Sequence, residues 1–229
     1  KTHTARRHVQ TEISSHRSHT VEDLDALVQR LLEPGNIIKS VRTRMEQLPQ
    51  SGAKIGAMLA QNATLETLDV SGSDFSDTAG DFASWTHPNA TLRTLKMRNC
   101  QLGFQHGQAL ERMIKGSQLQ ALDLSQNRDL GAPGIAEYTG GEPEAVGAIA
   151  HIAKAAPQSE LRHLALSNCR IDNDGAKYLA EMIAADGPLE TLDLGHNKSI
   201  GAAGINAIGE ALLQNDTLRA ITLPLEGLK

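Results

Sequence analysis

The sequence predicts an α/β solenoid in which short parallel strands alternate with helices around one continuous apolar core. Three observations predict it: an L-x-x-L-x-L pattern, with Val, Met or Ile replacing one leucine in some copies, recurs six times, most steps between the copies are nearly constant, and apolar residues between the copies return at helical spacing. The copies begin at Leu65, Leu92, Leu119, Leu161, Leu189 and Leu218, separated by 27, 27, 42, 28 and 29 residues. Such a period is typical of stacked units that bury their apolar faces against one another.

The residues before the repeats divide into two segments. Residues 1–19 are predicted to form a basic, histidine-rich tail. A helix-capping box then begins at Thr20, leucines follow at helical spacing, and Pro34 with Gly35 ends the pattern. We expect a helix over residues 20–33, within an N-terminal helical cap over residues 20–37, because the open end of a repeat stack must be covered.

The repeats themselves are predicted over residues 38–229. A weaker copy of the pattern begins at Ile38, which gives about seven units, and segments such as GAKIGAMLAQNATL and GINAIGEALLQNDTL are typical of helices. A helix is about 10 Å wide and neighbouring strands lie about 4.8 Å apart, so stacked units must fan outward on the helical side. We therefore expect a curved, horseshoe-shaped solenoid with a parallel sheet on its concave face and helices on its convex face.

Composition limits the class of partner. The net charge of -5 and the aromatic content of 3% give neither a basic surface nor stacking platforms for nucleic acid. No apolar run is long enough to span a membrane, and the start of the chain has no apolar segment of the kind a signal peptide needs. We expect a fragment of a longer protein that binds neither nucleic acid nor membrane.

The repeated pattern resembles the leucine-rich repeat family, and units of 27 to 29 residues with a full helix are similar to its ribonuclease-inhibitor-like subclass. The resemblance covers residues 38–229. It implies that the ninth residue of each unit turns inward and bonds to neighbouring backbone, forming a ladder along the solenoid. The alanine-rich helices also resemble those of bacterial leucine-rich repeat effectors delivered into host cells, which implies a location in the host cytoplasm if the protein is secreted.

The chain's two cysteines stand at this ninth position. Its occupants alternate from the second onward, in the order Ser73, Cys100, Asn127, Cys169 and Asn197. The cysteines are two units apart, so roughly 10 Å of sheet separates them, whereas a disulfide requires Cα atoms within about 7 Å. We predict two reduced, buried, structural thiols, with a metal-binding or nucleophilic role as the minor alternative. Buried thiols of this kind are typical of a reducing setting, so we expect a cytoplasmic location.

Candidate binding residues lie between the inward-facing leucines, since strand side chains alternate between two faces. On the expected concave face these are Arg42, Arg44, Asp69, Lys96, Arg98, Asp123, His163 and Asp193. The N-terminal third of this face is mixed to basic, and the remainder is small and mildly acidic. Such a surface could select a protein partner by charge, or its aspartates could simply be solvated.

An insertion interrupts the regular spacing. The 42-residue step contains 13 residues more than the 29-residue unit, placed near residues 136–148. The inserted segment contains Tyr138 beside two glycines and several glutamates, so we include Tyr138 among the candidate partner-binding residues. Insertions in solenoids form loops on one face and often bind something, although a tolerated surface loop is the equal alternative.

The sequence contains no motif for catalysis. A Gly-rich phosphate loop, H-E-x-x-H, a nucleophile elbow and a C-x-x-C pair are all absent. We predict a non-catalytic protein-interaction domain that uses no cofactor and no metal. Its C-terminal edge is expected either to be truncated or to be covered by another domain or subunit. The resemblance also implies an alternative, the substrate-recognition arm of a ubiquitin ligase or a GTPase-activating protein.

Overall fold

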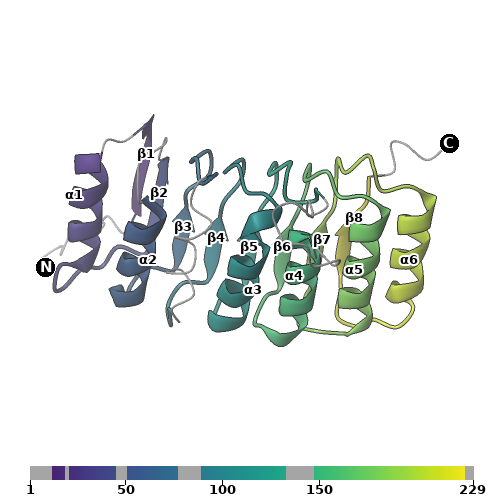
Figure 1. Cartoon of the computed structure of the whole chain (residues 1–229). Helices are drawn as coiled ribbons and strands as arrows, with labels where there is room; N and C mark the ends of the chain where they lie inside the picture. The colour runs from purple at the N-terminus through teal and green to yellow at the C-terminus, as the bar shows by residue number, and fades with distance from the viewer. Residues whose placement is uncertain (1–11, 19–20, 45–50, 77–88, 133–146, 225–229) are drawn as a thin grey trace, which may run out of the picture.

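The structure, a computed structural model, describes residues 12–18, 21–44, 51–76, 89–132 and 147–224. Within them one parallel sheet contains eight strands in sequence order, with the helices in a row along one side (Figure 1). The strands are β1 (Glu12–Ser18), β2 (Ser40–Arg44), β3 (Thr67–Asp69), β4 (Thr94–Lys96), β5 (Ala121–Asp123), β6 (His163–Ala165), β7 (Thr191–Asp193) and β8 (Ala220–Thr222). The helices are α1 (Val21–Leu32), α2 (Ser51–Gln61), α3 (Gly107–Gly116), α4 (Ala148–Ala155), α5 (Asn173–Ala184) and α6 (Ala202–Leu212). The predicted α/β solenoid is confirmed.

The strands pair without register shifts from β2 to β8, and this places equivalent leucines directly beside one another. The central row contains Leu68, Leu95, Leu122, Leu164 and Leu192, each at most 2% exposed. Burying one such side chain stabilises the fold by about 1.5–3 kcal/mol. The core therefore runs unbroken between the sheet and the helices.

Strand β1 corrects the predicted tail. Residues 12–18 pair in parallel with β2, Glu12 beside Ser40 and Ile13 beside Val41, so the sheet has one strand more than the predicted units. The predicted helix over residues 20–33 is α1, which follows β1 as each later helix follows its strand. The prediction of a tail is wrong over residues 12–18. EISSHRS has only one apolar residue, and pairing through the main chain does not require apolar side chains, so the apolar pattern did not indicate a strand.

The ninth position forms the expected ladder. Asn127 is fully buried; its Oδ1 accepts from the N–H groups of Cys100 (2.8 Å) and Leu102 (3.1 Å), and its Nδ2 donates to the carbonyls of Met97 (2.8 Å) and Leu124 (2.7 Å). Asn197 repeats this pattern in its own unit. Each asparagine therefore joins its unit to the preceding one.

The cysteines occupy the same ladder, as predicted. Both are free and fully buried, and each thiol donates to a carbonyl at 3.3 Å, Cys100 to Val70 and Cys169 to Leu124. Burial raises the pKa of each thiol to about 12. Such thiols are not ionised at neutral pH and are unsuited to nucleophilic chemistry.

A second row of asparagines, which the sequence analysis missed, lies where the helices lead into the strands. Asn62 and Asn89 are buried, and each accepts from the main chain two and three residues further on. Asn62 also donates to Leu31 O at 2.7 Å in the preceding unit. The recurring NATL, NATL and NDTL segments were the available signal.

His106 is a fully buried histidine at the entrance of α3, in the 3₁₀ turn η2 (Phe104–His106). Its Nδ1 accepts from Gly103 N at 3.0 Å, so Nε2 carries the proton and donates to Phe75 O at 3.1 Å. Burial lowers the pKa of His106 below its ordinary value of 6.5. The neutral ring therefore joins two neighbouring units.

We expect the free energy of unfolding to fall as the pH drops below about 6.5. Below that pH His106 is protonated in the unfolded chain, while the buried ring of the folded chain stays neutral until the pH reaches its lower pKa. The unfolded state therefore binds more protons, and acid favours unfolding. Urea titrations at several pH values should show this loss, and His106→Gln should lack that part of it while losing about 1–3 kcal/mol at neutral pH. Parallel pH profiles for wild type and variant would contradict this role.

Candidate partner-binding face

The candidate site is the face of the sheet that the helices leave uncovered (Figure 1). Because the strands pair in register, outward side chains form rows across it. The middle row, from β2 to β8, contains Arg42, Asp69, Lys96, Asp123, Ala165, Asp193 and Thr222. Most of the residues predicted for binding therefore lie on one face.

Much of the predicted positive charge on this face is compensated internally. Arg42 Nε lies 2.9 Å from Asp69 Oδ2, and Arg98 Nη1 lies 3.1 Å from Asp123 Oδ2. Arg44 Nε donates to the carbonyl of Gly72 at 3.0 Å. The mixed to basic surface expected from sequence is therefore an ordered set of pairs with less free charge than its composition indicates.

Asp69 is the most buried of these charged groups, at 6% exposed. Burial opposes its ionisation, but hydrogen bonds from Ser71 and the positive charge of Arg42 outweigh this and lower the pKa of Asp69. The carboxylate thus stays charged and holds Arg42 in place. Because the Arg42 side chain is 54% exposed, water screens the pair, and surface pairs contribute only about 0–1 kcal/mol to stability. The main effect of the pair is to fix side-chain positions.

Lys96 is the exception among the cations of the middle row. It stands in register between Asp69 and Asp123, yet both of those carboxylates are paired with arginines. Among the described residues Lys96 forms no ion pair. Its ammonium group is available to a partner's anion.

A hollow of about 140 Å³ adjoins Lys96 at the centre of the face. Its floor is made of small or apolar residues of β4 to β7, and its polar lining residues are Thr94, Lys96, Asp123, His163, Thr191 and Asp193. His163 Nδ1 lies 3.0 Å from Thr191 Oγ1, and Asp193 Oδ1 accepts from Gly195 N at 2.9 Å. Small-molecule pockets measure about 300–1,000 Å³, so the hollow suits a single partner side chain.

Tyr138 and most of the predicted insertion lie outside the described residues. After the insertion, described structure resumes at Gly147 and α4 begins at Ala148. The candidate role of Tyr138 stays a prediction.

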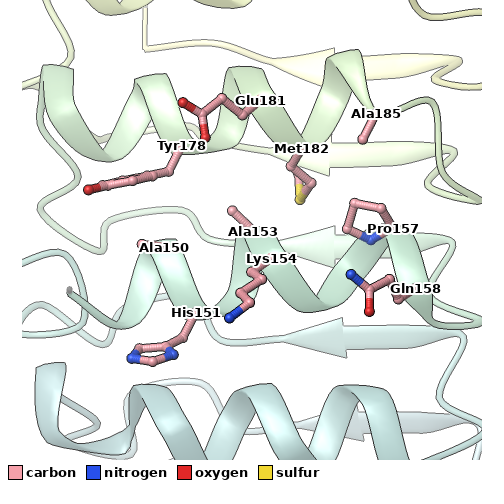
Figure 2. A pocket seen from close by; sticks show the side chains of 10 residues that line it. All are labelled: Ala150, His151, Ala153, Lys154, Pro157, Gln158, Tyr178, Glu181, Met182 and Ala185. Carbon is pink, nitrogen blue, oxygen red and sulfur yellow. The ribbon is translucent and has the colours of Figure 1, made fainter.

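The helical side carries a groove that the sequence analysis missed. It lies between α4 and α5, has a volume of about 470 Å³, and is shown in Figure 2. Figure 2 shows Ala153 of α4 and Met182 of α5 in the space between the two helices, with Tyr178 of α5 toward one end, and Tyr178 is 40% exposed. Tyr178, one of two tyrosines in the chain, was the available signal.

An ionic cluster joins α3 to α4 beside this groove. Glu111 accepts from Lys115 Nζ at 2.8 Å, and its Oε2 lies 2.6 Å from His151 Nδ1. The hydrogen bond from Lys115, together with that from His151, lowers the pKa of Glu111 to about 2.

Among the described residues no group of three or more His, Cys, Asp or Glu side chains could hold a metal ion. Within the same part of the chain, no helix has the length and apolar character that a membrane span requires.

Comparison with known proteins points to the family that the geometry indicates. A family model described as Leucine Rich repeat matches residues 61–81, 160–180 and 188–209. Mouse "NACHT, LRR and PYD domains-containing protein 12" is 28% identical over 196 residues, covering 84% of this chain and 17% of that protein. Pig "Ribonuclease inhibitor" is 27% identical over 179 residues, covering 76% of this chain and 36% of the inhibitor.

A solved structure of the leucine-rich repeat-containing protein LegL7 from Legionella pneumophila aligns with a TM-score of 0.49 and 18% identity. The alignment covers 91% of this chain and 72% of that one. Repeated family-model matches, the relatives and the parallel strand–helix architecture support a leucine-rich repeat protein of the ribonuclease-inhibitor-like type.

Proposed function

We propose that this chain is a non-catalytic interaction domain that holds a protein partner on its uncovered, concave face. Leucine-rich repeat proteins generally mediate protein–protein interaction. The observation that carries the choice of face is the central hollow, where Lys96, Asp123, His163 and Asp193 surround a floor of small residues. The strongest contacts of an interface concentrate near its centre, in pockets that the bound partner desolvates fully.

The charges of this face favour a partner of mixed charge. Lys96 would pair with a carboxylate, and Asp193, which forms no ion pair among the described residues, would pair with a cation at the other side of the hollow. The fixed pairs Arg42–Asp69 and Arg98–Asp123 would guide approach and register. A partner with a strong excess of one charge would meet repulsion at one end.

The test compares partner capture by wild type and by an Arg42→Glu, Arg44→Glu, Lys96→Glu variant. We expect the amount of bound partner to fall by about tenfold or more, because three of the face's cations are reversed. The matched control is Arg112→Glu, Lys154→Glu, Lys177→Glu, which makes the same charge change on α3, α4 and α5. Unchanged capture by the folded first variant, or equal loss in the control, would move the site away from the concave face.

The same face would serve if the chain were the recognition arm of a ubiquitin ligase or a GTPase-activating protein. The sequence of the full-length gene separates these cases, since a catalytic domain fused after Leu228 would replace the stand-alone role.

We also propose that the chain is part of a bacterial effector delivered into the host cytoplasm, because its alanine-rich helices resemble those of such effectors. Localisation of the tagged full-length protein tests this.

We also propose that another domain or subunit covers β8. Leu218, Ile221 and Leu223 are only partly buried, whereas their equivalents in the preceding unit, Leu189, Leu192 and Leu194, are 7%, 1% and 0% exposed. Leu213, at the end of α6, is 87% exposed. A covering strand–helix unit would bury this apolar surface as every earlier unit does.

A further inference from the structure

A second polar hollow lies on the loops that follow β4, β5 and β6. It has a volume of about 490 Å³ and draws its lining from three consecutive units. The lining residues are Asn99, Gln101, Leu102, Gln126, Arg128, Asp129 and Asn168. Leu102 is fully buried, so four side-chain amides, one guanidinium and one carboxylate stand over an apolar base.

The fold uses few of these polar groups itself. Asp129 accepts from Arg170 Nη1 at 3.4 Å. The side chains of the four amide residues and of Arg128 make no hydrogen bond or ion pair within the part of the chain that the structure describes. The neighbouring ninth-position asparagines, by contrast, use all their hydrogen-bonding capacity on the main chain.

The four amide residues hold left-handed backbone conformations. Their φ angles are 50° at Asn99, 56° at Gln101, 67° at Gln126 and 56° at Asn168. Glutamine adopts this region less readily than asparagine or glycine, yet the conformation recurs outside the hollow at Arg170 and His196, so it belongs to the turns of the repeat. What distinguishes the hollow is that four side-chain amides with no hydrogen bond among the described residues gather in it, and this points to a use outside the chain.

The chemistry of the hollow fits a polypeptide main chain. A side-chain amide offers one donor and one acceptor group, and Asn127 shows within this fold how such a group pairs with both N–H and C=O. Arg128 adds a guanidinium suited to a carboxylate. None of the lining residues is aromatic, so the hollow offers no stacking surface for a base.

The dimensions agree with a short extended segment. Three neighbouring units span two strand spacings, roughly 10 Å, which about three residues of an extended chain also span. We propose that this hollow, the amide rim, binds an extended acidic polypeptide segment, with its amides paired to the segment's main chain and Arg128 paired to a carboxylate. The proposal does not depend on the concave-face function, because the amide rim lies on the loops beyond the strands.

The test is an NMR titration of the full chain, observing backbone amides and side-chain NH₂ groups. The probe is an acetylated, amidated pentapeptide of alternating serine and glutamate, and its counterpart replaces each glutamate with lysine. We expect the NH₂ signals of the four amide residues to shift with the acidic peptide, and about tenfold weaker binding of the basic one.

Glycine substitutions provide a variant that should still fold. The double variant Gln101→Gly, Gln126→Gly removes two amides and relieves their backbone strain, so we expect unchanged or higher thermal stability and at least tenfold weaker peptide binding. Arg128→Gln should remove the preference for the acidic peptide, while Lys198→Gln, the tenth residue of a unit outside the hollow, should retain it. Equal binding of both peptides, unchanged binding by the glycine variant, or shifts produced only by an oligosaccharide such as maltohexaose would overturn the proposal.

Discussion

Asn127→Ala is expected to lower the free energy of unfolding by about 3–5 kcal/mol. The alanine would leave two N–H groups, of Cys100 and Leu102, and two carbonyls, of Met97 and Leu124, without their side-chain partner in the core. Each unsatisfied buried group costs about 1–3 kcal/mol, and local relaxation recovers part of the total. Denaturant unfolding measured by circular dichroism gives the difference directly.

The matched control is Asn206→Ala, the same substitution at an exposed position of α6. Its side chain has no hydrogen bond among the described residues, and alanine favours helices, so the change should stay within about 0.5 kcal/mol. A loss below about 1 kcal/mol at Asn127 would mean that the ladder does not join the units energetically.

Gly131→Ala should be the second severe substitution, with a loss of about 3 kcal/mol or more. A Cβ at this position would lie 2.5 Å from Cys169 O and 2.8 Å from Ile171 N, which are main-chain atoms of the next unit. Gly131 N already donates to Cys169 O at 3.0 Å, so the two backbones cannot separate without breaking that bond. The added Cβ would clash with main-chain atoms, and these cannot move aside as a flexible side chain could, so the clash lowers the stability of the fold.

Gly201 is the matched control, because GAPGI and GAAGI place Gly131 and Gly201 at equivalent points of their units. A Cβ on Gly201 would meet nothing closer than Asn173 Oδ1 at 3.6 Å. We expect Gly201→Ala to change the unfolding free energy by less than about 1 kcal/mol. Similar losses at the two glycines would contradict the contact between units assigned to Gly131.

Apolar periodicity predicted the repeat architecture because leucines report directly on burial. It also located the cysteines in the ladder, since Cys100 and Cys169 mark equivalent points in two units. Strand β1 was missed because main-chain pairing with β2 requires no particular side chains. The alternation of Cys and Asn units is visible in the backbone as well, where Gln101 and Arg170 follow the cysteines with positive φ.

The candidate site was predictable in composition and less so in geometry. Alternation placed Lys96, Asp123 and Asp193 in one row, as the strand register shows. Asp123 pairs with Arg98, while Lys96 has no ion pair among the described residues. This arrangement depends on side-chain directions across two units, which a sequence pattern does not carry. The amide rim was missed for a related reason, since its members come from three units and share no motif.

Amine acetylation of the complex with its captured partner tests the assignment of the concave face most directly. Lys96 reports on that face and Lys177, on α5, on the helical side, and peptide mass spectrometry measures each lysine in the free and bound states. We predict that partner binding lowers the acetylation of Lys96 by about tenfold and leaves Lys177 unchanged. Protection of Lys177 with Lys96 as reactive as in the free chain would contradict a partner held on the concave face.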